Sequence, residues 1–414
     1  MISEIINIGD ELLIGQVINT NASWLGEQLN LAGIRVEKMT VVADNHQAIM
    51  QSLKDAAAGN AEIILITGGL GPTRDDITKK VLCEFFDTRL VYHEDTMQNI
   101  VNLFAGRFLK IRESNRQQAE IPENCIPLPN YNGTAPGMWF EKDGKIFVSM
   151  PGVPFEMKPI VLEQVIPRLA ERPGISVIIH KTILTQGMGE SMIAEKIVSW
   201  EDRLPEHMKL AYLPQPGIVR LRISAAGDDK VILEKEVEEQ VEKLKHFIPD
   251  IIFGYGQDTL ESVTGNLLKE KGFTLSSAES CTGGYIAHLI TSVPGSSAYF
   301  KGSIIAYSNE IKTSELGVPE DVLLNYGAVS QETVLIMASN IRKKLRTDFA
   351  IAVSGIAGPD GGTPSKPVGT TWIAVAGPAG ETSRHFLMGE NRERNIRKAA
   401  LAALDMLRKE ILKS

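Results

Sequence analysis

The amino-acid sequence predicts an α/β protein with three domains, in which two α/β sandwiches with mainly parallel or mixed sheets flank a small α+β domain along the chain. A chain of 414 residues is too long for one hydrophobic core. Strand-like and helix-like runs alternate in the first and last parts of the chain, which is typical of α/β folds. Turn-rich stretches at residues 171–174 and 254–256 interrupt these runs. We therefore place the domains at residues 1–170, 171–253 and 254–414.

The overall composition is ordinary for a globular protein, with 43% apolar and 23% charged residues. A net charge of −8 argues against a protein that mainly holds nucleic-acid phosphates, so nucleic acid is not an expected partner. The three cysteines lie far apart without Cys-x-x-Cys spacing, which argues against a disulfide framework and a zinc site. No signal peptide or membrane-spanning apolar stretch is recognisable, so we expect a cytoplasmic protein without a membrane partner.

The first domain begins with five alternating elements. The pattern predicts strands at residues 4–9, 35–42 and 62–66, and helices at residues 21–31 and 46–58. Alternation of this kind predicts a parallel sheet with helices on both faces. Ligands of such sheets bind beyond the carboxyl ends of the strands. Three loops with glycine are expected at this edge, at residues 9–13, 67–76 and 150–154.

The loop at residues 67–76 is the most informative of the three. Its glycines allow the backbone to approach an anion closely, and its two threonines add hydroxyl donors. Asp75 and Asp76 are suited to hold a hard divalent cation against a phosphate. An alternative role for either aspartate is to cap the helix that follows. Asp10 and Glu11 form a second acidic pair, which either completes a metal site or is merely solvated.

These loops resemble the molybdopterin-binding-type domain of CinA proteins, through Gly-Asp-Glu-Leu-Leu, Thr-Gly-Gly-Leu-Gly-Pro-Thr-x-Asp-Asp and Met-Pro-Gly-Val-Pro. The resemblance implies metal-dependent hydrolysis of ADP-ribose to AMP and ribose 5-phosphate. The related fold in molybdenum-cofactor enzymes binds a pterin phosphate instead, so a non-catalytic binding domain is the alternative. We assign the divalent metal ion, whose identity stays open, to Asp75, Asp76 and Glu11. The residues assigned to the substrate are Gly68, Gly69, Gly71, Thr73 and Gly152.

The middle segment predicts a small α+β domain. Strands are expected at residues 177–185 and 218–225, and helices at residues 191–200 and 230–247. CinA proteins carry a KH-like module at this place in the chain. KH domains hold nucleic acid through a Gly-x-x-Gly loop, whereas this segment has Gly187-Met188-Gly189 and a glutamate-rich last helix. We therefore expect a spacer or dimerisation module, and a homodimer.

The third domain predicts a second α/β sheet, and its most informative stretch is Ser-Ser-Ala-Glu-Ser-Cys-Thr-Gly-Gly at residues 276–284. This stretch lies between a strand-like run that starts at Phe273 and a helix at residues 285–290. Ser280 and Thr282 are therefore expected at a sharp strand-to-helix turn. Free backbone N–H groups at a helix N-terminus stabilise a developing negative charge, which suits a nucleophile. The alternative is that Ser280 or Thr282 only caps the helix.

The remaining pattern of this domain is also of α/β type. It predicts strands at residues 301–307, 349–353, 369–375 and 382–387, and helices at residues 260–271, 308–316, 331–345 and 392–412. Residues 354–359 repeat the [Ser/Thr]-Gly-x-x-Gly-Pro form of residues 67–72, and both turns follow an apolar strand. We interpret them as two anion-binding turns of similar design and assign Gly355 to substrate binding.

Four motifs resemble the C-terminal domain of CinA proteins, which also occurs alone as nicotinamide mononucleotide deamidase. They are Ala-Glu-Ser-Cys-Thr-Gly-Gly, Tyr-Ser-Asn-Glu-x-Lys, Ser-Gly-Ile-Ala-Gly-Pro and Arg-Glu-Arg-x-x-Arg. The resemblance implies hydrolysis of nicotinamide mononucleotide to nicotinate mononucleotide and ammonia. Ser280 is then the nucleophile and Lys312 its base, since the scattered histidines form no Ser–His pattern. Tyr307 would relay a proton or orient Lys312, and Arg394 would hold the ribosyl phosphate.

The amides around Thr282, Gly283 and Gly284 are expected to receive the oxyanion, and this step needs no metal. Cys281 is a rival nucleophile, because a thiol at a helix N-terminus is acidified. Together the three segments resemble full-length CinA over essentially the whole chain. We therefore expect a hydrolase with two activities, whose partners are the small nucleotides nicotinamide mononucleotide and ADP-ribose. A nucleic-acid role linked to competence or DNA damage is a further hypothesis.

Overall fold

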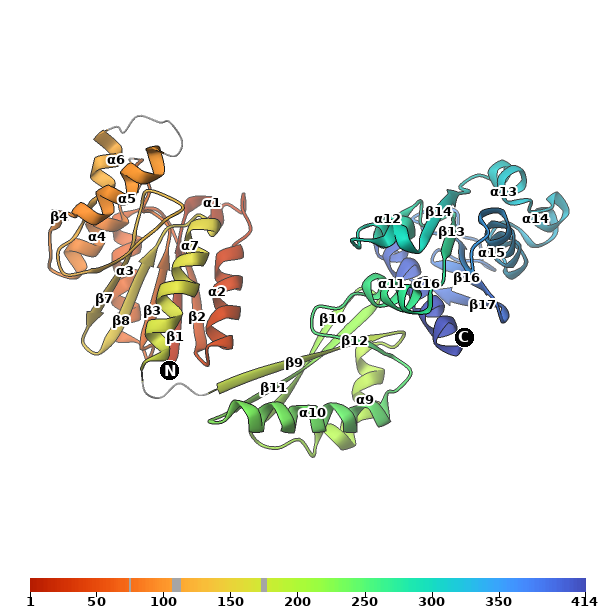
Figure 1. The fold of residues 1–414 in the computed structure, drawn as a ribbon, viewed down its shortest axis with the longest axis horizontal. Helices are drawn as coiled ribbons and strands as arrows, with labels where there is room; N and C mark the ends of the chain where they lie inside the picture. Colours follow the sequence, from red (N-terminus) through yellow and green to blue (C-terminus); the bar gives the residue numbers. More distant parts are fainter. Residues whose placement is uncertain (74–75, 106–112, 173–176) are drawn as a thin grey trace. The chain divides into compact units, whose positions relative to one another are not determined.

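The computed structural model describes residues 1–73, 76–105, 113–172 and 177–414 (Figure 1). The chain forms two compact units. The first unit comprises residues 1–179 with 225–234, and the second comprises residues 180–224 with 235–414. Both are α/β structures, and the second also contains most of a small antiparallel sheet.

The first unit is built on a six-stranded mixed sheet with the order β2-β1-β3-β8-β7-β6. The strands are β1 (Ile2–Ile8), β2 (Arg35–Val42), β3 (Ile63–Thr67), β6 (Ile126–Leu128), β7 (Gly137–Lys142) and β8 (Lys145–Met150). Strands β2, β1, β3 and β8 are parallel, as expected for the beginning of the chain. Strands β7 and β6 then continue the sheet in antiparallel fashion.

Two hydrophobic cores cover the two faces of this sheet. Successive strand residues point to opposite faces, so Ile5 packs in one core and Ile6 in the other. The Ile5 core takes Leu29 from α2 and Met157 from α7, and the Ile6 core takes Leu53 from α3. The helices are α1 (Asp10–Leu13), α2 (Thr20–Leu31), α3 (His46–Ala58), α4 (Thr78–Phe85), α5 (Glu94–Ala105), α6 (Glu113–Gln118), α7 (Pro154–Ile160) and α8 (Ile166–Ala170). A π-helical turn (Val161–Val165) joins α7 to α8, and β4 (Leu90–Tyr92) pairs with β5 (Glu120–Pro122).

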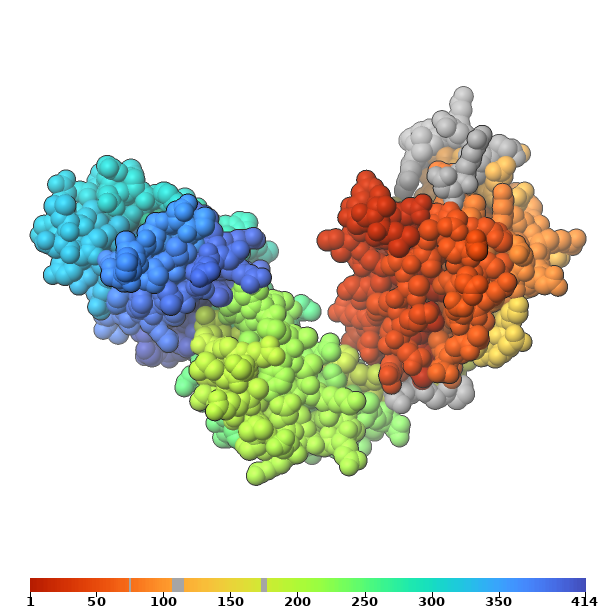
Figure 2. All heavy atoms as spheres, turned by 180° about the vertical axis from the view of Figure 1, so that it is seen from behind, coloured from red at the N-terminus to blue at the C-terminus, as the bar shows by residue number. Residues whose placement is uncertain are grey.

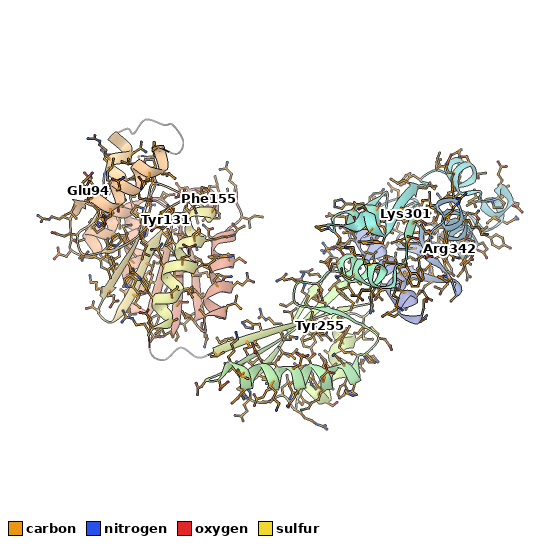
Figure 3. All side chains as sticks on the ribbon, in the orientation of Figure 1. Glu94, Tyr131, Phe155, Tyr255, Lys301 and Arg342 are labelled. Atoms are coloured by element: carbon orange, nitrogen blue, oxygen red, sulfur yellow. The ribbon has the colours of Figure 1, made fainter. Side chains whose placement is uncertain are left out.

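The middle module, from β9 to β12, has the order β10-β11-β9-β12. Its elements are β9 (Val177–Gln186), α9 (Glu190–Glu201), β10 (Met208–Gln215), β11 (Ile218–Gly227), α10 (Lys230–Phe247) and β12 (Ile252–Tyr255). This is the β-α-β-β-α-β arrangement of ferredoxin-like modules. The α+β class is confirmed, with β10 and β12 as additional strands. Tyr255, labelled in Figure 3, lies under the ammonium groups of Lys181 and Lys245, at 5.3 and 5.7 Å from its ring centre.

The C-terminal module, from α11 to α16, contains a five-stranded mixed sheet with the order β14-β13-β15-β16-β17. The strands are β13 (Leu275–Glu279), β14 (Phe300–Ile305), β15 (Phe349–Gly355), β16 (Thr370–Gly377) and β17 (Gly380–Leu387). The helices are α11 (Leu260–Lys271), α12 (Tyr285–Thr291), α13 (Asn309–Leu316), α14 (Glu320–Tyr326), α15 (Gln331–Leu345) and α16 (Arg392–Lys413). Strand β13 lies between the parallel strands β14 and β15, so it has a hydrogen-bonded neighbour on each side.

Helices α11, α12 and α16 cover one face of this sheet, and α13 to α15 cover the other. The first of these cores also contains Leu184 and Phe253 of the middle module. In the space-filling view the green atoms of the middle module accordingly abut the blue atoms of the C-terminal module (Figure 2). Among the described residues, no helix is both long and apolar enough to cross a membrane.

Candidate functional site

Ser280 lies directly after the interior strand β13, at the strand-to-helix turn that the sequence predicts. The strand continues through Glu279, so the sharp turn begins at Ser280 and the residues before it are extended. The Ser280 amide donates a hydrogen bond of 2.9 Å to the carbonyl of Val353 in β15. The side chain is 7% exposed. The hydroxyl is therefore held at the carboxyl edge of the sheet by two parallel strands.

The side chain of Lys312 meets Ser280 at this edge. Helix α13 carries Lys312, and Ser308 caps that helix by accepting a hydrogen bond from the Ile311 amide. The Lys312 ammonium nitrogen Nζ lies 3.1 Å from Ser280 Oγ. It also donates to the backbone carbonyls of Ala306 at 2.8 Å and Tyr307 at 3.3 Å. The dyad that the sequence predicts is thus in contact.

The surroundings of Lys312 make its amine easier to deprotonate than that of a free lysine. Only 1% of the residue is exposed, and burial lowers its pKa from the ordinary value, against the opposing charges of Cys281 and Glu310. A neutral amine has two N–H donors and one lone pair. In the neutral form the Ala306 and Tyr307 carbonyls would take the two donors, and the lone pair would face Ser280 Oγ. Lys312 is placed to accept the hydroxyl proton.

Glu279 occupies much of the helix N-terminus that was expected to serve as the oxyanion hole. Its buried carboxylate accepts hydrogen bonds from the amides of Gly284 at 3.0 Å, Ile286 at 3.1 Å and Ala287 at 2.9 Å. The Gly283 amide donates to the Ser280 carbonyl at 3.1 Å. The Gly283 and Gly284 amides are therefore already engaged inside the protein.

Thr282 is the remaining member of the expected oxyanion set. Among the described residues, none accepts a hydrogen bond from its amide. Its hydroxyl Oγ1 is buried and also has no partner among them. An unpaired buried polar group is costly, and a ligand oxygen next to Ser280 would relieve that cost. Among the described residues, Thr282 is therefore the member of the expected set whose amide and hydroxyl are both without a partner.

Cys281 is buried in the apolar core below the turn. Burial raises the pKa of its thiol to about 12, although the positive charges of Lys312 and Arg392 act in the opposite direction. A thiol that holds its proton so strongly is a poor nucleophile. The surroundings thus favour Ser280 over Cys281. Gly355 packs on the same sulfur: a Cβ there would lie 3.0 Å from Cys281 Sγ and 2.7 Å from Thr371 Oγ1.

The contacts of Tyr307 and of the arginines of α16 differ from those expected from the sequence. Tyr307 contacts Lys312 through its carbonyl, while its side chain is 60% exposed and its hydroxyl accepts a 3.0 Å hydrogen bond from Arg392. Arg392 also donates to the Gly358 carbonyl at 2.8 Å. Arg394 instead lines a separate cavity with Lys398. Arg392 is therefore the α16 arginine that is tied to the dyad's surroundings.

The first unit has a cavity of about 610 Å³ at the carboxyl edge of its sheet. All three predicted loops contribute to it. Of the residues assigned from the sequence, its lining includes Glu11, Gly68, Gly69, Gly71, Thr73, Asp76 and Gly152. Asp75 lies outside the described residues. The loops thus meet as the parallel strand order predicts.

The acidic side chains of this cavity form hydrogen bonds within the protein and also offer oxygen atoms to a ligand. Asp76 accepts hydrogen bonds from the amide and hydroxyl of Thr73, at 2.8 and 2.6 Å, so it holds the loop. Burial raises the pKa of Asp44, and the nearby charges of Asp10, Glu11 and Asp76 add to this rise, whereas a hydrogen bond from the Asp10 amide opposes it. No group of three or more His, Cys, Asp or Glu residues is arranged to hold a metal ion within the described part of the chain. The oxygen donors nevertheless suit a hard cation in chemical type.

Sequence reasoning missed Glu279, Arg392 and Asp44. Glu279 was quoted in the Ala-Glu-Ser-Cys motif, and an acidic residue before a helix N-terminus is a recognisable capping signal. Asp44 follows β2 directly, and the carboxyl end of each parallel strand is an expected site position. No sequence signal distinguishes Arg392 from Arg394, since both begin the same helix.

Comparisons with known proteins match all three parts of the chain. Residues 4–171 match the model of a probable molybdopterin binding domain. Residues 180–254 match the KH domain of damage-inducible protein CinA. Residues 257–411 match the CinA C-terminal domain.

Full-length relatives are similar along the entire chain. A CinA-like protein of Flavobacterium psychrophilum is 48% identical over 100% of this chain and 99% of its own length. A CinA-like protein of Cytophaga hutchinsonii is 47% identical over 99% of this chain and 98% of its own length. Among solved structures, competence/damage inducible protein CihA of Agrobacterium tumefaciens is 36% identical, covers 37% of this chain and 93% of its own, and has a TM-score of 0.36.

Proposed function

The chain belongs to the CinA family, and on that premise we propose that its C-terminal module hydrolyses nicotinamide mononucleotide to nicotinate mononucleotide and ammonia. The observation that carries the proposal is the buried contact of 3.1 Å between Lys312 Nζ and Ser280 Oγ. Amide hydrolysis needs a nucleophile, a base and a donor for the oxyanion. Ser280, Lys312 and Thr282 supply these three groups.

The first half of the reaction forms an acyl-enzyme. Ser280 Oγ attacks the carboxamide carbon, and its proton moves to Lys312 Nζ. The carbonyl oxygen becomes an oxyanion, which the Thr282 amide stabilises. The tetrahedral intermediate collapses with cleavage of the C–N bond, and the proton on Lys312 passes to the departing nitrogen. Ammonia leaves, and the nicotinoyl group remains as an ester on Ser280.

The second half repeats the proton transfer with water. Lys312 accepts a proton from the attacking water, whose oxygen bonds to the ester carbon. The C–Oγ bond breaks and the proton returns to Ser280 Oγ. The product is a carboxylic acid, which ionises to nicotinate mononucleotide. The step consumes one water and leaves both side chains in their starting state.

The substrate phosphate needs a cation, and α16 offers two arginines for it. The family resemblance assigns this role to Arg394. The hydrogen bonds of Arg392 to Tyr307 and Gly358 favour Arg392, because they hold its guanidinium beside the strand ends that carry the dyad. Arg392→Lys keeps the charge but loses the forked geometry, so we expect a higher KM with a smaller change in kcat.

The serine assignment is tested by two neighbouring variants. Ammonia release from nicotinamide mononucleotide should disappear in Ser280→Ala, since a missing nucleophile removes the acyl-enzyme route. It should largely persist in Cys281→Ala, because the thiol of Cys281 is buried and strongly protonated. The opposite pattern would assign the nucleophile to Cys281.

A second activity is favoured by the cavity of the first unit. We propose that this unit cleaves ADP-ribose to AMP and ribose 5-phosphate with a divalent cation held by Glu11, Asp76 and Asp75. A bound cation would neutralise the diphosphate and polarise a phosphoryl oxygen. The glycines of the 67–76 loop would let backbone amides approach the diphosphate.

The alternative is a unit that binds nucleotide or pterin phosphate without catalysis. Asp76→Asn separates the two, because the amide oxygen can still accept from Thr73 and keep the loop in place. Catalysis predicts that AMP production is lost in this variant and with chelator, while ammonia release is unaffected. Binding alone predicts no AMP production from the parent protein with any divalent cation supplied.

A further inference from the structure

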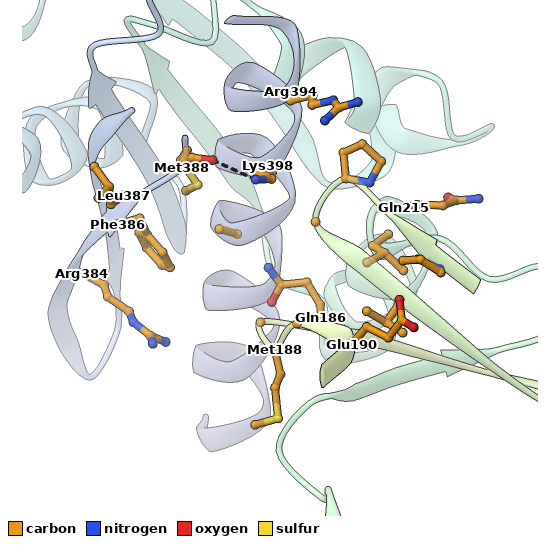
Figure 4. A pocket seen from close by; sticks show the side chains of 18 residues that line it. Gln186, Met188, Glu190, Gln215, Arg384, Phe386, Leu387, Met388, Arg394 and Lys398 are labelled. Atoms are coloured by element: carbon orange, nitrogen blue, oxygen red, sulfur yellow. Dashed lines mark hydrogen bonds between the residues drawn. The ribbon is translucent and has the colours of Figure 1, made fainter. Parts of the chain in front are cut away.

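The second unit contains a cavity that the proposed amidase site does not use. It has a volume of about 660 Å³ and is drawn in Figure 4. The middle module contributes the loop after β9 and the turn between β10 and β11. The C-terminal module contributes the end of β17 and one side of α16. Neither Ser280 nor Lys312 lines it.

Three cationic side chains line this cavity. Arg394 and Lys398 are four residues apart on α16 and so lie on one side of the helix, and Arg384 comes from β17 (Figure 4). Lys398 Nζ donates to the Met388 carbonyl at 2.8 Å. Within the described residues, no carboxylate forms an ion pair with any of the three cations. Glu190 is the one carboxylate in the lining, so an anionic ligand would meet an excess of positive charge.

The rest of the lining suits a nucleobase. Phe386 and Met388 provide apolar and aromatic surface, and Gln186 and Gln215 add side-chain amides that can both donate and accept (Figure 4). A volume of about 660 Å³ lies within the usual range for small-molecule sites. Aromatic surface, amides and clustered cations are the groups that a base and a phosphate require together.

The two walls of the cavity are held together by close packing. Gly217, in the turn between β10 and β11, has a φ of +87°, and a Cβ there would lie 3.1 Å from Leu401 Cδ1 and 3.6 Å from Lys398 Cα. Glycine is therefore needed for both the backbone conformation and the approach to α16. Leu184 of β9 is buried in the C-terminal core. The cavity is therefore formed where the middle module packs against the C-terminal module.

We propose that this cavity is a second nucleotide site, which binds a nucleoside monophosphate with its phosphate on Arg394 and Lys398 and its base against Phe386 and Met388. The site is separate from the proposed amidase centre. Residues two positions apart on a helix point to nearly opposite sides, so Arg392 faces Tyr307 while Arg394 faces the cavity. A ligand there contacts both modules and ties the middle module to the C-terminal one.

The test measures AMP binding to the full-length protein by isothermal titration calorimetry. Lys398→Gln removes one phosphate-facing charge, and we expect it to weaken AMP binding about tenfold or more. Gly189→Trp places a bulky side chain at the cavity from the middle module, since Gly189 belongs to the lining. The φ of Gly189 is −77°, which any residue can adopt, and a Cβ at this position would have no atom within 4 Å. The substitution should block AMP to a similar degree without touching the C-terminal module.

Matched controls carry the same changes elsewhere. Lys343→Gln removes an exposed lysine from α15, and Ser191→Trp adds the same bulk to an exposed position at the start of α9 outside the cavity lining. Both should bind AMP as the parent does. Ser280→Ala should also bind AMP normally, so failure of the amidase proposal and failure of this one give different results.

The outcomes decide the ligand class as well as the site. Adenosine and inorganic phosphate should each bind more weakly than AMP, since each makes half of the contacts. Inorganic phosphate that binds as tightly as AMP and ignores Gly189→Trp would reduce the site to a bare anion site and overturn the nucleotide proposal. AMP affinity that is equal in Lys398→Gln, Gly189→Trp and their controls, or undetectable in the parent, would overturn the site itself.

Discussion

The turns at residues 67–72 and 354–359 share a residue pattern and both follow a central strand. Their glycines nevertheless pack against different kinds of atoms. At Gly68 the φ is +108°, and a Cβ would lie 2.1 Å from the Ile8 carbonyl oxygen. At Gly355 the contacts are the sulfur of Cys281 and the hydroxyl of Thr371. The first turn lines an open cavity, whereas the second closes the core beneath Ser280.

The difference shows that the shared pattern marks close backbone approach and does not by itself mark an anion site. In the first unit the turn lines a cavity together with the carboxylates of Glu11, Asp44 and Asp76. In the second unit the proposed chemistry rests on two side chains that are already in contact, Ser280 and Lys312. The anion-binding interpretation of residues 354–359 stays a prediction, and packing already accounts for the glycine at position 355.

The pair of Ser280 and Lys312 is tested most strongly by removing its base. Lys312→Met keeps the buried methylene chain but loses the nitrogen, and we expect ammonia release to fall by about 10²–10⁴-fold. Lys301→Met is the matched control, because Lys301 is an exposed lysine on β14 (labelled in Figure 3). Equal ammonia release from the two variants would remove Lys312 from the mechanism.

The contrast between open and packed glycines is tested by stability. Gly68→Ala combines a positive φ with a backbone clash, and we expect it to lower the free energy of unfolding by about 3 kcal/mol. Gly144→Ala has a φ of +78° but open space around the Cβ, so its cost should be about 1 kcal/mol. Urea unfolding of both variants checks the order, and a larger cost at Gly144 would contradict it.

The role of Glu279 distinguishes the second site from a free helix N-terminus. Glu279→Gln keeps the size but turns one acceptor oxygen into a donor that faces backbone N–H groups. We expect a loss of about 1–3 kcal/mol in the free energy of unfolding. Urea unfolding measures this loss. Unchanged stability would show that the amides of α12 do not depend on the carboxylate.

The pH dependence of ammonia release gives the smallest expected effect, which is counted per pH unit. Burial lowers the pKa of Lys312 below its ordinary value of 10.5, and only the neutral amine accepts the Ser280 proton. The rate should therefore rise with pH, by about tenfold per unit below that pKa, and level off before pH 10.5. A rate of ammonia release that does not change with pH below 10.5 would mean that Lys312 does not need to lose its proton. The pH profile of kcat/KM is the measurement.

Much of the fold could be predicted from sequence where periodicity was strong. The bounds of β2, α3, α10 and α15 agree with the expected ranges at both ends. The hairpin of β7 and β8 was missed, although its Asp143-Gly144 turn, with φ values of +52° and +78°, carries a recognised hairpin signal. Strands β10 and β12 were missed because β12 is short and β10 has no clear alternation of buried and exposed residues.

The site could be predicted in its chemistry but less well in its orientation. Ser280 was expected from the strand-to-helix turn after β13, and Lys312 from the family resemblance. The parallel pairing of β13 with β14 places Ser280 near the start of α13, which carries Lys312. The choice between Arg392 and Arg394 depends on the rotation of α16 about its axis. That rotation is fixed by packing against the sheet, which local sequence does not encode. The engagement of the α12 amides by Glu279 likewise requires three-dimensional distances.

The two carbonyls that hold Lys312 have a consequence for how protons travel through the second site. Ala306 and Tyr307 fix two of the three positions around the nitrogen, and the side chain has almost no contact with solvent. The third position faces Ser280 Oγ. In the proposed mechanism the nitrogen therefore takes up the hydroxyl proton and delivers a proton to the departing ammonia on this same side.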